Sequence, residues 1–246
     1  MKKLIQTSMN ISICLSSLTA YASGNKELLF VKQFIQPQGL VFDVGAHKGA
    51  KTDLYLAQHA QVVCIEPQPA CVELLMRKYQ FNPQVQIVSQ GLAEAPGSME
   101  LYICSDSPTI STFSEEWQHG RFENYNWDKK VTVPVTTLDA LIAEFGVPCF
   151  CKIDVEGFEY IVLKGLSQPI AYISFEFTKE LFKNSKLCLQ HLKNLGYTNF
   201  NYALGETPAL VHHQWISAEQ LITEIEKHPD HLLWGDIYAH YEKNTI

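Results

Sequence analysis

A glycine-containing turn directly after a short apolar run constrains the fold of this chain more than any other feature. Residues 40–42 read Leu-Val-Phe and predict a buried strand, which ends in the acid Asp43. Gly45 and Gly49 follow, and a helical pattern begins after them. Glycine lets a backbone adopt positive φ and approach a ligand closely. The order therefore predicts a turn without side chains at the carboxyl end of a strand, where open α/β sheets bind their ligands.

Three cofactor motifs compete for this turn. The dinucleotide motif G-x-G-x-x-G, read from Gly45, fails because His47 and Ala50 stand where it needs its second and third glycines. A phosphate-binding P-loop fits residues 45–52, except that Ala50 replaces its second glycine. The pattern D-x-G-x-x-x-G fits without a mismatch, and an acid beside the glycines suits the cationic groups of S-adenosylmethionine. A turn that binds no ligand is the structural alternative.

A second acid at a strand end favours the cofactor interpretation. Residues 61–65 predict another buried strand, and Glu66 follows it. In nucleotide-binding α/β folds, an acid about 20 residues past the glycine turn accepts hydrogen bonds from ribose hydroxyls. The alternative is a solvated acid at a strand end. The solvated acid is the weaker alternative, because Asp43, Gly45 and Gly49 stand at the positions that the cofactor pattern requires relative to Glu66.

The composition describes one globular domain of 246 residues, 46% of them hydrophobic and 18% charged. The formal net charge is −7 with scattered basic residues, so we expect no nucleic-acid partner. No stretch has the roughly 18 apolar residues of a transmembrane helix, so we expect no integral membrane span. The 7 cysteines form no C-x-x-C pair and fit free thiols in a reducing compartment.

The first 24 residues stand apart from the rest. Two lysines precede a moderately apolar stretch at residues 9–19, and Ala20-Tyr21-Ala22 has the A-x-A form of a signal-peptidase site. Residues 1–24 are thus a candidate signal peptide or N-terminal extension of the domain at residues 25–246. Export would separate the protein from a cytosolic cofactor, so the chemistry favours the cytoplasm and the two indications conflict.

Strand and helix patterns alternate along the domain. We expect strands near residues 40–43, 61–66, 85–89, 149–154, 172–177, 199–204 and 236–241. This alternation predicts an α/β fold with a parallel or mostly parallel sheet. Residues 97–135 break the rhythm and predict a hairpin-like insertion around an aromatic-rich loop at residues 105–130. A loop of this length is a functional lid or disordered, and its aromatic content argues against disorder.

A second group of acids follows the strand near residues 149–154. Asp154, Glu156 and Glu159 lie close together at its carboxyl end, where a substrate would meet the cofactor. A carboxylate there could orient a hydroxyl or accept its proton. The alternative is negative charge at a helix N-terminus, worth about 0.3–1 kcal/mol, which suits Glu156 or Glu159 better than Asp154. Together with Glu176 these acids could hold a divalent ion, but their spacing requires none and we predict no metal.

At this point the motifs resemble those of the FkbM family of methyltransferases. The similarity rests on residues 43–49, Ile65-Glu66-Pro67, Leu138-Asp139, the run from Lys152 to Gly165, and Glu176. It covers roughly residues 38–180, with a plausible continuation to the end of the chain. The resemblance implies a Rossmann-like α/β fold with a seven-stranded, mostly parallel sheet and S-adenosylmethionine as cofactor. It also implies O-methylation of a hydroxyl on a sugar or another natural-product acceptor.

The resemblance assigns roles to individual residues. Asp43, Gly45 and Gly49 would hold the methionine part of the cofactor and Glu66 its ribose. Apart from the resemblance, Gly91 and Leu92 follow the strand expected near residues 85–89, where they could face an adenine ring. The residues expected around the cofactor are Asp43, Gly45, Ala46, His47, Gly49, Glu66, Gly91 and Leu92. Those expected on the acceptor side are Asp154 and Glu156 as catalytic residues, and Ser111, Thr112 and Glu176 as substrate contacts. His47 stands where Asn is commoner in the family, and its imidazole can still form hydrogen bonds.

Two other functions stay open. A P-loop-like NTPase at residues 45–52 would bind magnesium nucleotides. A catalytically inactive effector with the same fold would bind a partner without the cofactor, although the intact set of Asp43, Gly45, Gly49 and Glu66 argues against it. The sequence indicates neither the identity of the acceptor nor the oligomeric state.

Overall fold

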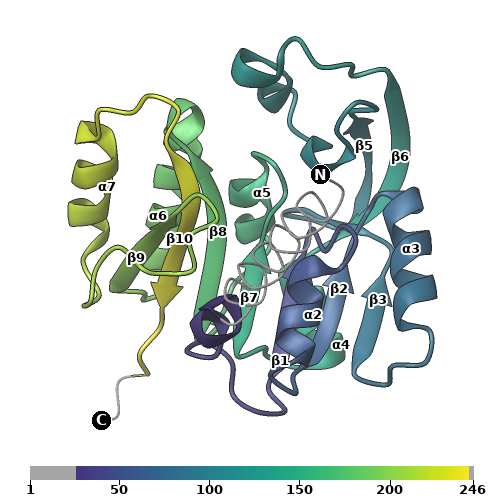
Figure 1. Cartoon of the computed structure of the whole chain (residues 1–246), viewed down its shortest axis with the longest axis horizontal. Coiled ribbons are helices and arrows are strands. Elements are labelled where there is room, and N and C mark those ends of the chain that lie inside the picture. Colours follow the sequence, from purple (N-terminus) through teal and green to yellow (C-terminus); the bar gives the residue numbers. More distant parts are fainter. Residues whose placement is uncertain (1–25, 244–246) are drawn as a thin grey trace, which may run out of the picture.

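A seven-stranded sheet forms the centre of the molecule, with the strand order β3-β2-β1-β7-β8-β10-β9 (Figure 1). The computed structural model describes residues 26–243, so the candidate signal peptide lies outside the described residues. The strands are β1 (Leu40–Val44), β2 (Gln61–Ile65), β3 (Val85–Val88), β7 (Phe150–Ile153), β8 (Tyr172–Thr178), β9 (Asn199–Leu204) and β10 (Trp234–His240). Strand β10 runs antiparallel to both of its neighbours, whereas β3, β2, β1, β7 and β8 pair in parallel. The expected Rossmann-like, mostly parallel sheet is confirmed.

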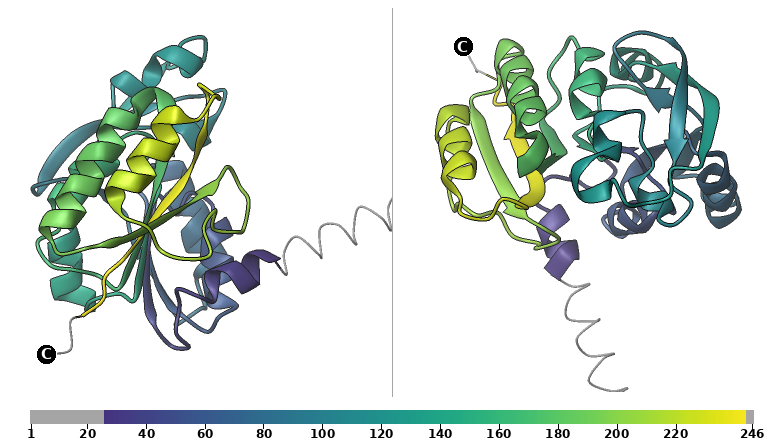
Figure 2. Two further views of the ribbon diagram at one scale, coloured as in Figure 1. Left: turned by 90° about the vertical axis from the view of Figure 1, so that its left-hand side faces the viewer. Right: turned by 90° about the horizontal axis from the view of Figure 1, so that it is seen from above.

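Helices cover both faces of this sheet (Figures 1 and 2). Helices α2 (Ala50–Leu56) and α3 (Pro69–Tyr79) pack on one face together with the helical residues 26–31. The other face is covered by α4 (Leu138–Phe145), α5 (Glu159–Lys164), α6 (Phe182–Asn194) and α7 (Ala218–Lys227). Successive residues of a strand point to opposite faces of the sheet, so Val41 packs against the layer of α2 and α3 and Phe42 packs against the layer of α4 to α7. Coverage of both faces explains why β1, β2 and β7 are almost wholly apolar.

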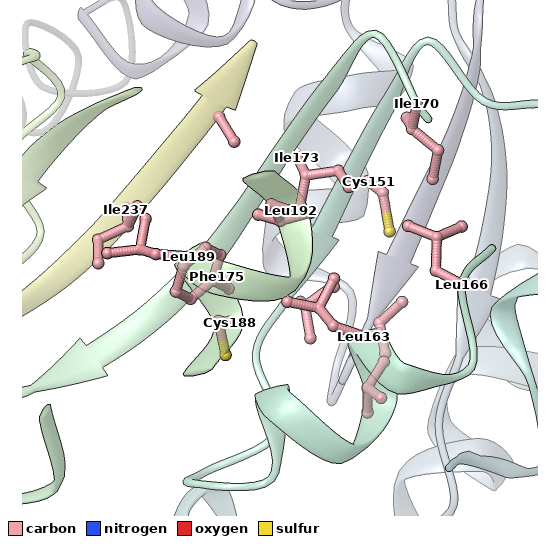
Figure 3. Packing of buried hydrophobic residues seen from close by; sticks show 14 of the residues in the cluster. Cys151, Leu163, Leu166, Ile170, Ile173, Phe175, Cys188, Leu189, Leu192 and Ile237 are labelled. Atoms are coloured by element: carbon pink, nitrogen blue, oxygen red, sulfur yellow. The ribbon is translucent and has the colours of Figure 1, made fainter. Parts of the chain in front are cut away.

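The largest of the three hydrophobic clusters in the described residues includes side chains between strands β7, β8 and β10 and helices α5 and α6 (Figure 3). Leu163, Phe175 and Leu192 have no exposed surface, and the thiols of Cys151 and Cys188 are equally enclosed. These cysteines are free and pack as small apolar groups, as the sequence predicts. This core fixes β7 against β8 and thereby positions the residues at their carboxyl ends.

The insertion at residues 97–135 forms a small sheet of its own. Strands β5 (Gly97–Ile103) and β6 (Lys129–Thr136) pair antiparallel, and the short β4 (Gly91–Leu92) joins the other edge of β6. Between β5 and β6 the chain forms three short 3-10 turns, η1 (Pro108–Ile110), η2 (Glu116–Gln118) and η3 (Gly120–Phe122). The hairpin and the ordered aromatic loop are as expected, since Phe113 and Trp117 are buried. In Figure 1 the insertion lies at the end of the molecule toward which β1 and β2 point.

Helix α7 was not expected from the sequence, although its signals are present. Ser217 precedes it, and the hydroxyl oxygen of Ser217 accepts a hydrogen bond from the Gln220 amide. Leu221 and Ile225, one turn apart, are both buried. Helix α6 directly follows the turn η4 (Lys179–Leu181). Within residues 26–243, no helix has both the length and the apolar character that crossing a bilayer requires.

Candidate active site

The turn after β1 forms one wall of the candidate site. Gly45 and Gly49 adopt φ angles of 81° and 76°, which glycine tolerates best. The Gly45 amide donates a 2.9 Å hydrogen bond to the Ile65 carbonyl and so ties this turn to the end of β2. A Cβ atom at Gly45 would overlap the carbonyl oxygen of Asp154. Glycine is therefore required here, because the turn packs directly on the chain that leaves β7.

Asp43 is a buried acid beneath this turn, with 2% of its surface exposed. Its Oδ2 atom accepts a 2.5 Å hydrogen bond from the Thr52 hydroxyl. Burial raises the pKa of Asp43 to about 6, while the Thr52 hydrogen bond and the nearby charge of Lys152 act in the opposite direction. Asp43 lines the main cavity, where a cationic ligand would favour its ionised form.

The same contacts argue against a P-loop. A P-loop needs its Ser or Thr hydroxyl on a magnesium ion and its Lys on the phosphates. Thr52 is fully buried and its hydroxyl donates to Asp43. Lys51, at the position of the P-loop lysine, forms a 3.1 Å ion pair with Glu206. A triphosphate at this turn would also meet the carboxyl group of Asp43, so the geometry disfavours the NTPase alternative.

Glu66 joins the turns that follow β1 and β2. Its Oε2 atom accepts a hydrogen bond from the His47 amide and its Oε1 atom accepts one from the Gln68 amide, both at 2.8 Å. Burial raises the pKa of Glu66 to about 7, although both hydrogen bonds lower it. Glu66 lines a small pocket of about 50 Å³ beside the main cavity.

Three acids come together on the opposite side of the cavity. Asp154 and Glu156 follow β7, and Glu176 belongs to β8; one carboxylate oxygen of each lies within 4.8 Å of the others. Burial, followed by the charges of the neighbouring acids, raises the pKa values of Glu156 and Glu176 well above the ordinary range. Glu159 has a different role, because its Oε1 atom accepts hydrogen bonds from the Val155 and Gly157 amides. The sequence group of Asp154, Glu156 and Glu159 is therefore divided in space.

Lys152 is a site residue that the sequence analysis did not single out. It is 4% exposed, and its Nζ atom lies 2.7 Å from Asp236 Oδ1 and 3.2 Å from Asp154 Oδ2. Lys152 pairs with Asp43 in the sheet register, so both side chains lie on the same face. A lysine inside an otherwise apolar strand is the signal that could have revealed it.

The main cavity has a volume of about 520 Å³. Its walls come from the turn after β1, the ends of β7 and β8, the insertion, and the loops beside β9 and β10. The insertion contributes a polar and aromatic wall of Thr109, Ile110, Trp117, Arg121 and Phe122. Arg121 is held there by a bidentate ion pair with Glu180, and its Nη2 atom also donates to the Leu232 carbonyl.

The structure brings most of the expected residues to two adjoining pockets. The residues that line the main cavity are Asp43, Gly45, Ala46, His47, Asp154, Glu156 and Glu176. The residues that line the small pocket are Gly45, His47, Glu66, Ser111, Thr112, Asp154 and Glu156. Four residues lie in both sets, so the two pockets share a wall. An elongated ligand could extend from the acids after β7 to Glu66.

Some of these residues are held by other contacts. The Thr112 hydroxyl donates to the Glu156 carbonyl at 2.7 Å and accepts from the Ser114 amide, so it anchors the insertion and is not free for a substrate. Ser111 lies beside it in the small pocket, away from Glu176. Gly49 lines neither pocket and packs against Tyr79, whose hydroxyl donates to the Gly49 carbonyl at 2.8 Å.

Gly91 and Leu92 are not brought to either pocket. Leu92 is 2% exposed and belongs to the largest hydrophobic cluster. Gly91 pairs with Val135, and a Cβ atom at Gly91 would lie 2.6 Å from the Phe113 ring. Their place at the end of a strand suggested a contact with adenine, but pairing of β4 with β6 directs them toward packed side chains.

Comparison with protein-family models matches residues 43–202 to the Methyltransferase FkbM domain. The chain belongs to the FkbM methyltransferase family. The matched range begins at Asp43 and includes the acids after β7, the insertion and Glu176. This FkbM protein is thus a methyltransferase by family, and the family implies S-adenosylmethionine as its cofactor. A comparison with curated proteins found no match.

Solved methyltransferase structures resemble the FkbM protein at low sequence identity. The precorrin-6y C5,15-methyltransferase of Geobacter metallireducens is 10% identical with a TM-score of 0.47, over 89% of this chain and 88% of that one. An O-methyltransferase of Thermotoga maritima is 9% identical with a TM-score of 0.43, over 90% of this chain and 66% of that one. An rRNA methylase of Streptococcus thermophilus is 10% identical with a TM-score of 0.42, over 88% and 94% of the two chains.

Proposed function

We propose that this FkbM methyltransferase methylates a hydroxyl oxygen of a sugar or another natural-product acceptor. The observation that supports this most is the arrangement of the main cavity. It has the glycine turn and Asp43 on one side, and Asp154, Glu156 and Glu176 on the other. A methyl donor on the first side would meet an acceptor hydroxyl on the second. The aromatic wall of the insertion suits a ring-shaped acceptor.

The residues on the first side fit S-adenosylmethionine. Asp43 accepts a hydrogen bond from a hydroxyl, and within the described residues it has no ion pair of its own. An ionised Asp43 would therefore gain from the positive charge of the cofactor. Gly45 presents bare backbone to both pockets and Glu66 lies beyond it. Asp43 and Gly45 would hold the methionine part, and Glu66 the ribose.

The cofactor supplies an electrophilic methyl group on a sulfonium, and the protein mainly positions the acceptor. Asp154 and Glu156 would orient the acceptor hydroxyl and receive its proton as the oxygen–carbon bond forms and the carbon–sulfur bond breaks, leaving its electron pair on sulfur. A carboxylate with an ordinary pKa near 4 is a weak base toward an alcohol. Burial and the neighbouring acids raise the pKa of Glu156, and a carboxylate with a raised pKa is a stronger base once it is ionised. Trp117 and Phe122 would exclude water from the reaction.

Replacing Asp43 by asparagine should weaken binding of S-adenosylmethionine by roughly 10- to 100-fold. The variant keeps the shape of the side chain and removes its charge, and a hydrogen bond to a charged group contributes about 1.5–3 kcal/mol. Calorimetric titration of the wild type and Asp43→Asn measures the difference. Glu144→Gln, an exposed acid-to-amide change on α4, is the matched control and should bind as the wild type does.

Two outcomes would contradict the proposal. A folded wild-type chain that binds no S-adenosylmethionine would overturn it, and binding of magnesium-ATP in its place would restore the NTPase alternative. Equal affinity in Asp43→Asn and the wild type would leave the fold and family intact but remove Asp43 from the cofactor site. Screening of hydroxylated sugars and polyketides for methyl transfer then tests the acceptor class.

Cofactor binding should strengthen as the pH rises from about 5.5 to 7.5. The pKa of Asp43 is raised to about 6, so this acid is largely protonated at pH 5 and largely ionised at pH 7 in the free protein. Because the cationic ligand prefers the ionised form, affinity should fall roughly tenfold per pH unit below that pKa. Calorimetry at pH 6 in two buffers of different ionisation enthalpy should show proton release on binding. Asp43→Asn should lose most of this pH dependence, and a flat profile in the wild type would contradict the assignment.

A rise in pH should strengthen cofactor binding but should lower the stability of the free protein. The folded-state pKa values of Asp43 and Glu66, about 6 and about 7, lie above their ordinary values of 3.8 and 4.5. Between these values the folded state holds more protons than the unfolded state. The contribution of both groups to stability therefore falls as the pH rises from about 4 to about 7. Urea unfolding at both ends of this range, without ligand, measures the loss.

A further inference from the structure

The acids on the acceptor side of the cavity have a second possible ligand besides an acceptor hydroxyl. We propose that Asp154, Glu156 and Glu176 bind one divalent cation, Mg²⁺ or Mn²⁺, through a carboxylate oxygen each. The proposal goes beyond the sequence, whose spacing alone required no metal. Cation binding does not depend on the methyl-transfer reaction, whereas a role for the cation in that reaction rests on the proposed function.

The spacing of the three oxygens suits a small cation. They lie within 4.8 Å of one another and come from two elements, the turn after β7 and strand β8. Around Mg²⁺, with oxygen ligands at about 2.0–2.1 Å, adjacent ligands are roughly 3 Å apart and opposite ligands about 4.2 Å apart. A small inward movement of the carboxylates would complete one face of an octahedron. The donor set contains only oxygen, which favours Mg²⁺ or Mn²⁺ over Zn²⁺.

An unsatisfied oxygen in Glu176 is the independent sign of a ligand. Glu176 lines the main cavity, and its Oε2 atom is buried without a hydrogen-bond partner among the described residues. A buried polar atom without a partner costs about 1–3 kcal/mol, and more when it is charged. A partner for this oxygen must therefore come from the cavity and satisfy it there. A cation held jointly with Asp154 and Glu156 does so.

The charges around the group also call for a cation. The ammonium of Lys152 is the one basic group that forms an ion pair with these acids in the described part of the chain, and only with Asp154. It lies closer to Asp236, at 2.7 Å, than to Asp154, at 3.2 Å. Glu156 and Glu176 consequently face each other and Asp154 without a positive partner. A divalent cation among the three carboxylates would supply the positive charge that they lack.

A cation here would explain how a carboxylate site deprotonates an alcohol. Its free coordination positions would face the cavity, where water or acceptor hydroxyl oxygens can fill them. Coordination lowers the pKa of a bound hydroxyl, so its proton leaves more readily before or as the methyl group arrives. Two neighbouring hydroxyls of one acceptor could occupy two positions together. The site would then favour vicinal diols, which sugars commonly carry, over isolated alcohols.

Titration of the full chain with Mn²⁺, followed by electron paramagnetic resonance of the free ion, tests the proposal without any acceptor. We expect one saturable site per chain, displaced by excess Mg²⁺. Glu176→Gln and Glu156→Gln should each weaken binding at least tenfold, whereas Glu144→Gln should bind Mn²⁺ as the wild type does. Circular dichroism and thermal melting establish that each variant is folded. Glu156 lies in a turn, so its variant serves if Glu176→Gln fails to fold.

The outcomes separate this inference from the proposed function. S-adenosylmethionine binding is measured on the same sample without metal. A chain that binds the cofactor but shows no saturable Mn²⁺ binding overturns the cation site alone. Mn²⁺ binding that is unchanged in both glutamine variants overturns it as well, because the ion then lies elsewhere. Displacement of Mn²⁺ by S-adenosylmethionine also overturns it, since the acids would then receive the positive charge of the cofactor.

Discussion

Gly45→Ala should lower the free energy of unfolding by about 2–5 kcal/mol and abolish cofactor binding. Gly45 has a φ of 81°, and a left-handed conformation costs a residue with a Cβ atom about 1–2 kcal/mol. The new methyl group would also overlap the Asp154 carbonyl oxygen, and overpacking of this kind costs about 1–3 kcal/mol. Relief of the overlap would move the turn after β1 away from the end of β7. Urea unfolding and titration with S-adenosylmethionine measure the two effects.

Gly120→Ala is the matched control for this prediction. Gly120 also has a positive φ, 66°, but a Cβ atom there would meet nothing within 4 Å. Its substitution should therefore cost only the conformational part, about 1–2 kcal/mol. Equal losses of stability in the two variants would show that the contact between the two strand ends contributes nothing, and would contradict the packing argument.

Lys152→Met should destabilise the protein by about 3–5 kcal/mol at neutral pH. The substitution removes the ammonium between Asp154 and Asp236 and leaves both carboxylates without it, and breaking a buried ion pair on one side costs about this much. Methionine fills a similar volume, so the loss reflects charge more than packing. Equilibrium unfolding in urea measures the change.

Two further variants show whether the buried charge is the cause. Adding Asp236→Asn to Lys152→Met removes one of the two carboxylates that lost their ion pair, and should recover part of the lost stability. Lys186→Met breaks a pair with Glu226 in which both side chains are about half exposed, and should cost less than about 1 kcal/mol. If the double variant is less stable than Lys152→Met, the pair with Asp236 does not account for the effect.

The residues proposed to hold the cofactor could be grouped from the sequence because they are close together along the chain. Asp43 belongs to β1, Gly45 and His47 belong to the turn after it, and Glu66 follows the next strand, so two local patterns were enough. The hydrogen bond from the His47 amide to Glu66 joins exactly these two patterns across 19 positions. Parallel neighbouring strands end at the same edge of a sheet, so adjacency in sequence order implied adjacency in space.

The contact between Lys152 and Asp236 could not be predicted in this way. The two residues are 84 positions apart and belong to β7 and β10, which do not neighbour each other in the sheet. Lys152 and Asp236 come into contact because β10 lies between β8 and β9 and runs antiparallel to both. No local pattern in residues 234–240 indicates that order. Gly91 and Leu92 line neither pocket for a related reason. Strand β4 pairs with β6, and this pairing decides which way the two residues face.

The sequence by itself determined the α/β fold, the family and the turns that we propose to hold the cofactor, because hydrophobic periodicity and the positions of glycines and acids act over a few residues. Only the tertiary structure decided which acids share a space. It placed Glu176 beside Asp154 and Glu156, turned Glu159 to the backbone, and closed the cavity with the insertion. Electrostatic interaction depends on distance in space, so the chemistry of these carboxylates follows from neighbours that the order of the chain does not reveal.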